Sequence, residues 1–311
     1  MTGTKGNRAM KIFLIIILIL VVIAAVVGYI TAGYVMGIRR QTLEEARAWQ
    51  ESQYDLSWYD AADKSDYKIT SYDGYELNVQ FIPFDEPSDS YVIISHGYSD
   101  NRFGALKYGF IYRDMGFNLI VYDLRGHGLN EPTYCTYSVR ESKDLLELIK
   151  DTRERYDNVK VLGLQGESLG AATSLAALES KPEIDFLVAD CPFEDIEKVL
   201  KEGMKSMHIP GVLLDLANPF IKLRYGVSFR DMRPIDRITE NQVPVLFMHG
   251  AADWFITPDN SEDMCRATAG YSDIMLIEGA EHAMSVIVDP KGYEAKVRDF
   301  LLKLNGRTSW K

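Results

Sequence analysis

Residues 159–178 read VKVLGLQGESLGAATSLAAL. The stretch places an apolar strand, Val159–Leu164, directly before a turn and an alanine-rich helix. The turn itself, GESLG at 166–170, matches Gly-x-Ser-x-Gly, a pentapeptide that is uninformative on its own. Between a strand and a helix it fits the tight turn that lifts a serine nucleophile above a sheet, because a side chain at either glycine would meet neighbouring backbone. Ser168 is therefore the candidate nucleophile, and a glycine-rich packing turn is the weaker alternative.

Outward from this turn, short apolar strands alternate with helices. Strands are expected at 67–71, 75–81, 91–95, 117–123, 159–164, 186–189, 245–249 and 274–277. Such alternation predicts an α/β fold with a mostly parallel central sheet, helices on both faces and strands buried on both sides. Two apolar helices within about 194–235 interrupt the pattern. They predict a small helical lid, although an ordinary connecting pair of helices fits equally well.

A serine hydroxyl needs a neighbouring base, and the chain has five histidines. His282 follows the last expected strand at its C-terminal end, where ligands of parallel sheets collect. We therefore expect His282 to be the base. The other histidines are expected to be structural, since most buried polar groups are satisfied locally; they are His96, His127, His208 and His249.

The base needs an acid to orient it. Asp253 follows the strand 245–249 and lies on a separate strand end from His282. Asp190, at the end of an earlier strand, is the main alternative. Glu278 and Glu281 are too close to His282 along the chain to turn back onto its ring. The predicted order is thus Ser168, Asp253, His282.

An acyl-transfer site also needs amides that point at the developing oxyanion. The backbone N–H of Leu169, directly after Ser168, is expected to supply one of them. The backbone N–H of Tyr98, on the loop after strand 91–95, is expected to supply the other.

The N-terminal region reads as a membrane span. Residues 12–38 contain no charged residue, and about 20 apolar residues cross a bilayer core as a helix. A cleaved signal peptide, with a shorter apolar stretch and a small-x-small site, fits less well. Three basic residues flank each end, so charge does not fix the orientation. The short leading segment favours an N-terminus inside and a catalytic body outside the cytoplasm.

Net charge and cysteine content limit the kinds of partner and site that the protein can have. The net charge is −11, although residues 1–40 carry five basic residues and no acid. An acidic body argues against a nucleic-acid partner. The three cysteines indicate neither a disulfide framework nor a zinc site, and whether any of them pair stays open. Neither the oligomeric state nor a metal is indicated.

Five motifs together resemble the α/β-hydrolase superfamily, over about residues 66–305: HGYSDN at 96–101, YDLRGHG at 122–128, GESLG at 166–170, HGAAD at 249–253 and AEH at 280–282. The chain looks most similar to a bacterial membrane-anchored branch, related to serine aminopeptidases and to esterases of the monoacylglycerol lipase kind. The resemblance implies a Ser-His-Asp triad, an oxyanion hole and no metal or organic cofactor. The sequence differs from the pattern of this family at Leu129-Asn130-Glu131, directly after the YDLRGHG motif, where relatives often carry Glu-Ser.

These features predict a short N-terminal segment (1–11), a transmembrane anchor (12–38), a membrane-proximal linker (39–65) and an α/β-hydrolase domain (66–305). The aromatic residues Trp49, Tyr54 and Trp58 could face lipid or pack on the body. The expected activity is cleavage of small acyl esters or lipid-like esters through an acyl-enzyme, in a single-pass membrane protein. A peptidase or amidase and a catalytically idle binding module are the alternatives. Removal of residues 1–38 is expected to leave an active body.

Overall fold

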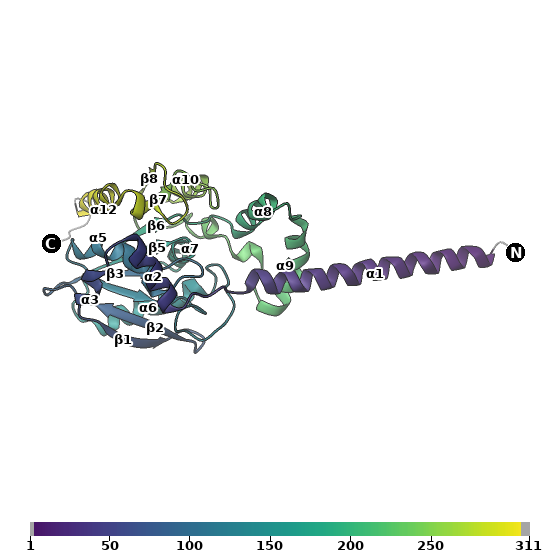
Figure 1. Cartoon of the computed structure of the whole chain (residues 1–311), viewed down its shortest axis with the longest axis horizontal. Coiled ribbons are helices and arrows are strands. Elements are labelled where there is room, and N and C mark those ends of the chain that lie inside the picture. Colours follow the sequence, from purple (N-terminus) through teal and green to yellow (C-terminus); the bar gives the residue numbers. More distant parts are fainter. Residues whose placement is uncertain (1–2, 306–311) are drawn as a thin grey trace.

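A computed structural model describes residues 3–305 of the chain, as a body from which one long helix projects (Figure 1). The strands are β1 (Ser65–Thr70), β2 (Glu76–Ile82), β3 (Ser90–Ser95), β4 (Asn118–Tyr122), β5 (Val161–Glu167), β6 (Phe186–Asp190), β7 (Val245–Gly250) and β8 (Ser272–Ile277). The α-helices are α1 (Gly3–Met36), α2 (Leu43–Gln53), α3 (Ser57–Ala61), α4 (Arg102–Ala105), α5 (Gly109–Arg113), α6 (Glu141–Arg155), α7 (Leu169–Ala177), α8 (Ile196–Ser206), α9 (Val212–Tyr225), α10 (Asp259–Ala267), α11 (Ser285–Val288) and α12 (Pro290–Asn305).

The strands form one sheet in the order β1-β2-β4-β3-β5-β6-β7-β8. β1 and β2 pair as an antiparallel hairpin, and β2 pairs antiparallel with β4, while β3 to β8 are all parallel. Gly74 adopts a φ of 84° in the hairpin turn, a conformation that glycine tolerates best. The mostly parallel sheet predicted from the sequence is therefore confirmed.

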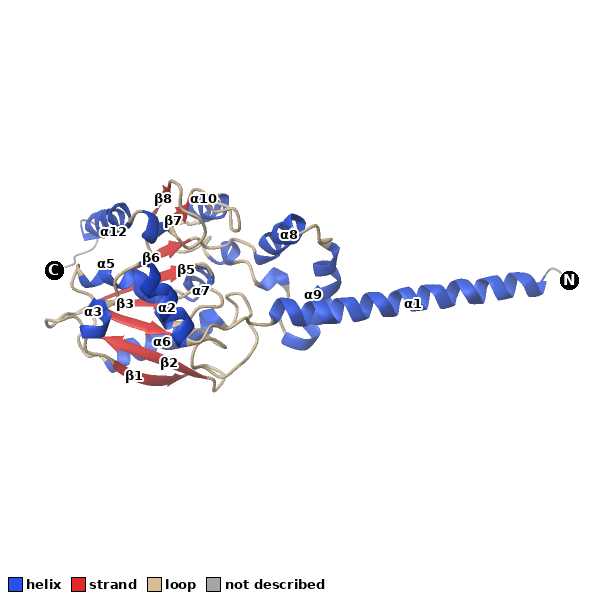
Figure 2. Ribbon diagram, in the orientation of Figure 1, coloured by secondary structure: helices blue, strands red, loops and turns tan. Residues whose placement is uncertain are grey.

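Helices cover both faces of the sheet, as the continuous apolar strands require. One apolar layer joins α6, α7, α9 and α10 to the sheet. The other layer joins α2 to α5, α11 and α12 to its opposite face. In Figure 2 the arrows of the parallel strands point toward the side of the body from which α1 leaves. The carboxyl ends of these strands, where parallel sheets hold ligands, thus lie on the same side as α1.

One stretch differs in detail from the sequence prediction. The single helix expected over 103–115 is divided into α4, a 3₁₀ turn and α5. Gly104 and Gly109, which are poor helix formers, lie at this division. Between β6 and β7, the two expected apolar helices form as α8 and α9.

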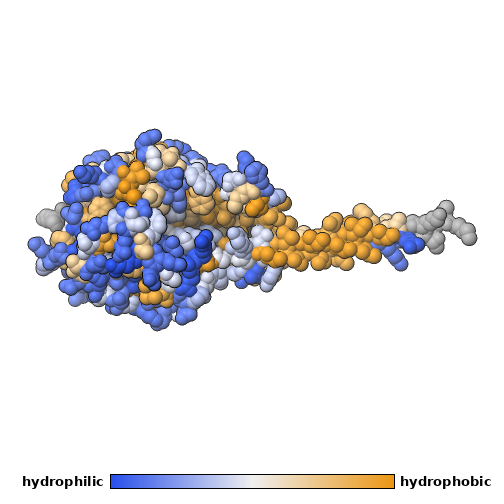
Figure 3. Space-filling model, in the orientation of Figure 1, coloured by the Kyte–Doolittle hydropathy of each residue, from blue (hydrophilic) through white to orange (hydrophobic). Residues whose placement is uncertain are grey.

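The helix α1 has two distinct parts. Residues 12–23 are exposed along their whole length and form the hydrophobic rod in Figure 3. In contrast, Ala32, Val35 and Met36 are buried against the body, in the same apolar layer as α9. The uniform apolar sequence of α1 gives no indication of this change. The last turns of α1 are therefore part of the folded body.

Candidate active site

Ser168 occupies a strained turn between β5 and α7. Its φ is 51° and its ψ is −113°, outside the usual regions for a residue with a side chain. The flanking glycines make this turn possible. A Cβ on Gly166 would lie 2.6 Å from the backbone of Ala171, and one on Gly170 would lie 2.2 Å from the carbonyl oxygen of Ser95. Glycine at 166 thus permits the close approach of α7 to the end of β5, and glycine at 170 permits its close approach to β3.

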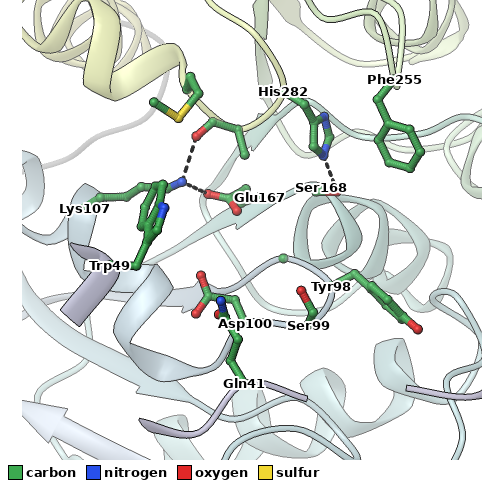
Figure 4. A pocket seen from close by; sticks show the side chains of 13 residues that line it. Gln41, Trp49, Tyr98, Ser99, Asp100, Lys107, Glu167, Ser168, Phe255 and His282 are labelled. Carbon is green, nitrogen blue, oxygen red and sulfur yellow. Dashed lines mark hydrogen bonds and ion pairs between the residues drawn. The ribbon is translucent and has the colours of Figure 1, made fainter. Parts of the chain in front are cut away.

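The structure brings the three residues of the predicted triad into contact. His282 Nε2 lies 3.0 Å from Ser168 Oγ, and His282 Nδ1 lies 2.6 Å from Asp253 Oδ2. Ser168 follows β5, Asp253 follows β7 and His282 follows β8, so one edge of the sheet carries all three. Figure 4 shows the His282 ring directed at the Ser168 hydroxyl. This is the geometry that a hydroxyl, its base and an orienting carboxylate need.

Asp253 is 3% exposed and is held by several donors besides His282. Its Oδ1 accepts hydrogen bonds from the amides of Phe255 and Ile256 at 3.0 and 2.9 Å. His249 Nε2 lies 3.3 Å from its Oδ2. Burial opposes ionisation of Asp253, but the hydrogen bonds from His249 and His282 outweigh burial and hold its pKa below the ordinary value. Asp253 is thus a carboxylate at neutral pH.

The alternative acids lie elsewhere. Asp190 accepts hydrogen bonds from Ser285 Oγ and from Tyr108 Oη, each at 3.0 Å. Burial, reinforced by the charge of Glu167, raises the pKa of Asp190 to about 6. Within residues 3–305, no hydrogen bond or ion pair joins Asp190 to His282. Glu278 and Glu281 are exposed.

Two amides next to Ser168 fit an oxyanion hole. A Cβ on Gly97 would lie 3.6 Å from the Cβ of Ser168, so the loop carrying Tyr98 passes directly beside the hydroxyl. Leu169 begins α7, where amides have no intrahelical acceptor. Among the described residues, the amides of Tyr98 and Leu169 donate to no protein acceptor. Both are therefore free to bind an anionic oxygen.

The cavity at this site has a volume of about 360 Å³. Its lining mixes aromatic, apolar and charged residues: Gln41, Trp49, Gly97, Tyr98, Ser99, Asp100, Lys107, Glu167, Ser168, Phe255, His282, Ala283 and Met284. Figure 4 shows Ser168 and His282 at one side of the cavity, with Lys107, Glu167 and Trp49 at the other. Its volume lies within the range of sites that bind small molecules.

A buried ion pair forms one wall of the cavity. Lys107 and Glu167 pair with side-chain exposures of 3% and 7%. Lys107 Nζ also donates to the carbonyl oxygen of Ala283, at 2.8 Å. Because Ala283 follows His282 and has a φ of 60°, this contact fixes the loop that carries the candidate base. Lys107 therefore positions His282 without touching it.

The chain segment after α1 is bound to the Tyr98 loop. Tyr98 Oη donates to the carbonyl oxygen of Gly37 at 2.6 Å, and the amide of Gln41 donates to that of Ser99 at 2.9 Å. Tyr137 Oη donates to the carbonyl oxygen of Val35 at 2.6 Å. The bonds to Gly37 and Val35 satisfy carbonyl groups that the end of α1 leaves open. The N-terminal region, including Gln41 and Trp49, thus contributes directly to the site.

The sequence prediction missed Lys107, Glu167 and the contact of His249 with Asp253. Glu167 lies within the GESLG turn, but nothing in that motif indicates its partner. Lys107 lies six residues after the HGYSDN motif, but its partner Glu167 is 60 residues further along the chain. The sequence predicts only a structural role for His249, which precedes Asp253 by four residues. A buried lysine has no local sequence signal, because its burial depends on tertiary packing.

Cys191, Asp253 and His282 also lie close together, with their possible ligand atoms within 4.8 Å of one another. Burial raises the pKa of the Cys191 thiol well above its ordinary value. A metal would need the thiolate, which this environment disfavours. Asp253 and His282 already bond to each other, so the donor set fits a metal poorly.

Comparison with known proteins agrees with the fold. The family model described as "Serine aminopeptidase, S33" matches residues 86–222. An esterase of Pyrococcus furiosus, Pf2001, superposes with a TM-score of 0.66 at 23% identity, covering 80% of this chain and 96% of its own. The ferulic acid complex of Est1E from Butyrivibrio proteoclasticus has a TM-score of 0.59 at 15% identity, covering 77% and 99%. The uncharacterized protein YqkD of Bacillus subtilis is 29% identical over 91% of this chain and 94% of its own length. The architecture is the α/β-hydrolase fold.

Proposed function

We propose that this chain is a serine hydrolase of the α/β-hydrolase superfamily, which cleaves carboxylic esters through an acyl-enzyme. The observation that carries the proposal is the pair of contacts of His282, 3.0 Å to Ser168 Oγ and 2.6 Å to Asp253 Oδ2. Such a pair activates a hydroxyl that is otherwise a weak nucleophile at neutral pH.

The proposed reaction has two stages. Ser168 Oγ attacks the ester carbonyl carbon while His282 Nε2 takes the hydroxyl proton, and the amides of Tyr98 and Leu169 bind the resulting oxyanion. The tetrahedral species collapses as His282 gives the proton to the departing alcohol, which leaves the acyl group on Ser168. Water, deprotonated by His282, then attacks this acyl group and releases the carboxylic acid and free Ser168. Asp253 stabilises the imidazolium in both stages.

A second candidate, hydrolysis of an aminoacyl bond, has one specific observation in its favour. Asp100 lines the cavity, and burial raises its pKa to about 6, with the charge of Glu167 adding to the effect. Lys107 is already paired with Glu167, so Asp100 could accept a substrate ammonium group. Ester hydrolysis is preferred because it needs no such group.

We propose that α1 is an uncleaved anchor and that the body lies outside the cytoplasm. Within residues 3–305, one helix, Asn7–Met36, is long and apolar enough to cross a membrane. A signal sequence passes the same test. The burial of Ala32, Val35 and Met36 in the body favours retention, since cleavage after the span would expose their apolar contacts.

Labelling with a fluorophosphonate probe tests the nucleophile. We expect the full-length chain to be labelled and Ser168→Ala to remain unlabelled, with a melting temperature close to that of the wild type. Equal labelling of the variant would refute the assignment. A panel of p-nitrophenyl esters and aminoacyl-p-nitroanilides then decides between the two candidate substrates, and labelling without turnover of any ester would contradict the ester proposal.

A further inference from the structure

The helices α8 and α9 present apolar side chains to solvent at the end of the body nearest α1. Met207, Ile209 and Val212, in and after the turn between these helices, are 63%, 38% and 55% exposed. In Figure 1 this turn and α9 lie at the end of the body from which α1 leaves. Figure 3 shows hydrophobic surface continuing from α1 onto the same end of the body. We call residues 207–212 the tip.

The position of the tip relative to α1 is fixed by close packing of α9. A Cβ on Gly28 would lie 2.3 Å from the carbonyl oxygen of Leu216, so glycine permits the two backbones to touch. Phe220 packs edge-on against the ring of Tyr29, with centroids 6.1 Å apart. Arg224 donates to the carbonyl oxygen of Tyr29 at 2.9 Å. These contacts hold α9 along the last turns of α1.

The length of a membrane span then fixes the depth of the tip. A hydrocarbon core of about 30 Å takes about 20 helical residues at about 1.5 Å each. Counted from Ile12, the first residue after Lys11, such a span ends near Thr31. Gly28 lies within its last turn, so α9 lies at the edge of the hydrocarbon.

The charge of this region fits an anionic lipid surface. Helices α8 and α9 together carry five basic and three acidic side chains, whereas the whole chain has a net charge of −11. Lys198, Lys201 and Lys222 form ion pairs with nearby acids, so among the described residues Lys205 and Arg224 are the basic side chains of these helices without an acidic partner. A basic segment with apolar side chains at its end is the combination that lies in the headgroup region of a bilayer.

We propose that the tip inserts into the outer layer of the membrane that α1 crosses, and that the catalytic site receives its substrate from this lipid surface. The parallel strands end on the side of the body from which α1 leaves (Figure 2), so the site lies on the side that faces the proposed membrane. The part of the inference that concerns substrate rests on the function proposed above, whereas insertion of the tip does not.

Fluorescent labelling of the full-length chain in vesicles tests insertion directly. In a Cys265→Ser background, Met207→Cys and Val212→Cys each carry a single environment-sensitive nitrobenzoxadiazole label, because Cys135 and Cys191 are buried. Leu302→Cys on α12 is the matched control, since Leu302 is 62% exposed. The vesicles contain phosphatidylglycerol and a lipid with a nitroxide on its acyl chain, which quenches only labels that enter the lipid.

We expect the labels at 207 and 212 to be quenched about twofold or more, and the label at 302 to be unaffected, because interfacial segments enter about 5–10 Å deep. Equal quenching at all three positions would overturn the proposal, as would failure of the chain to remain in the vesicles. These results do not depend on catalysis, so they stand even if the hydrolase proposal fails.

A second experiment tests the supply of substrate. The double variant Met207→Ser, Val212→Ser is expected to hydrolyse a soluble p-nitrophenyl ester at the wild-type rate. Its turnover of a long-chain ester embedded in vesicles is expected to fall about tenfold, and Leu302→Ser should leave both rates unchanged. An equal loss on both substrates, or no loss on either, would refute delivery from the membrane. No activity of the wild type on any ester would instead refute the hydrolase proposal.

Discussion

Shortening the chain from its N-terminus should separate the apolar rod of α1 from the part that belongs to the body. Removal of residues 1–27 deletes the exposed rod and keeps Gly28, Ala32, Val35 and Met36 with their contacts. Removal of residues 1–38 deletes these contacts as well. The sequence alone suggests that the second shortened chain is active, whereas the structure predicts that it is much less stable than the first.

The difference follows from the bonds that the second deletion breaks. It removes the carbonyl acceptors of Tyr137 Oη, the Cys135 amide and Tyr98 Oη, which lie on Val35, Met36 and Gly37. Each bond contributes about 1 kcal/mol. Burial of the Val35 and Met36 side chains contributes roughly 1.5–3 kcal/mol each. The loss is therefore on the order of 5 kcal/mol or more, against a total of about 5–15 kcal/mol for a typical domain.

Thermal unfolding in detergent and turnover of p-nitrophenyl butyrate measure the outcome. A loss of this size lowers the melting temperature by roughly 10–20 °C for a domain of this length. The chain without residues 1–27 should match the full-length chain in kcat and KM. In the chain without residues 1–38, kcat should fall because Tyr98 loses its bond to Gly37. If the two shortened chains melted within about 3 °C of each other with equal kcat, the last turns of α1 would not support the site.

Three further predictions concern single side chains. Asp253→Asn should lower kcat by roughly two to four decades with KM nearly unchanged, because an amide favours the wrong imidazole tautomer. If Asp190→Asn caused this loss instead, the acid of the triad would be Asp190 at the end of β6. Lys107→Met should lower the free energy of unfolding, measured by chemical denaturation, by about 3–5 kcal/mol, because it leaves Glu167 buried without its partner. The double variant Lys107→Met, Glu167→Gln should recover most of this loss, and no recovery would contradict the pairing. The pKa of Asp190 is raised to about 6 in the fold, so ionisation opposes folding as the pH rises from about 4 through 6. The melting temperature of Asp190→Asn relative to the wild type should therefore rise between pH 4 and pH 8. If the difference between the two melting temperatures did not change with pH, the pKa of Asp190 would not be raised in the fold.

The fold could be predicted because its signals are local. The turn at Ser168 has glycines where α7 meets β5 and β3. The strands are short apolar runs that only a doubly covered sheet can bury. The contact of Ser168, His282 and Asp253 could be anticipated for the same reason. Each follows a strand of one parallel sheet, and the carboxyl ends of such strands meet at a single edge.

Other parts of the site depend on tertiary contacts that no local pattern records. The ion pair of Lys107 with Glu167 joins the α4–α5 region to the end of β5. The burial of Met36 follows from its position at the end of a helix that is apolar on every side. A uniformly apolar helix has no face that indicates which residues leave the lipid and enter a protein core.

The capping of α1 by the body has a consequence for biosynthesis. The bond between Tyr137 and Val35 closes a sequence separation of 102 residues, and that between Arg224 and Tyr29 closes one of 195. At about 5–20 residues per second, the ribosome needs several seconds after making α1 to complete even the first of these partners. The helix can enter the bilayer during that interval, while its last carbonyl groups still bond to water. For the membrane anchor proposed above, docking of the finished body onto α1 would then be a late step of folding, and assembly of the Tyr98 loop would follow insertion of the helix.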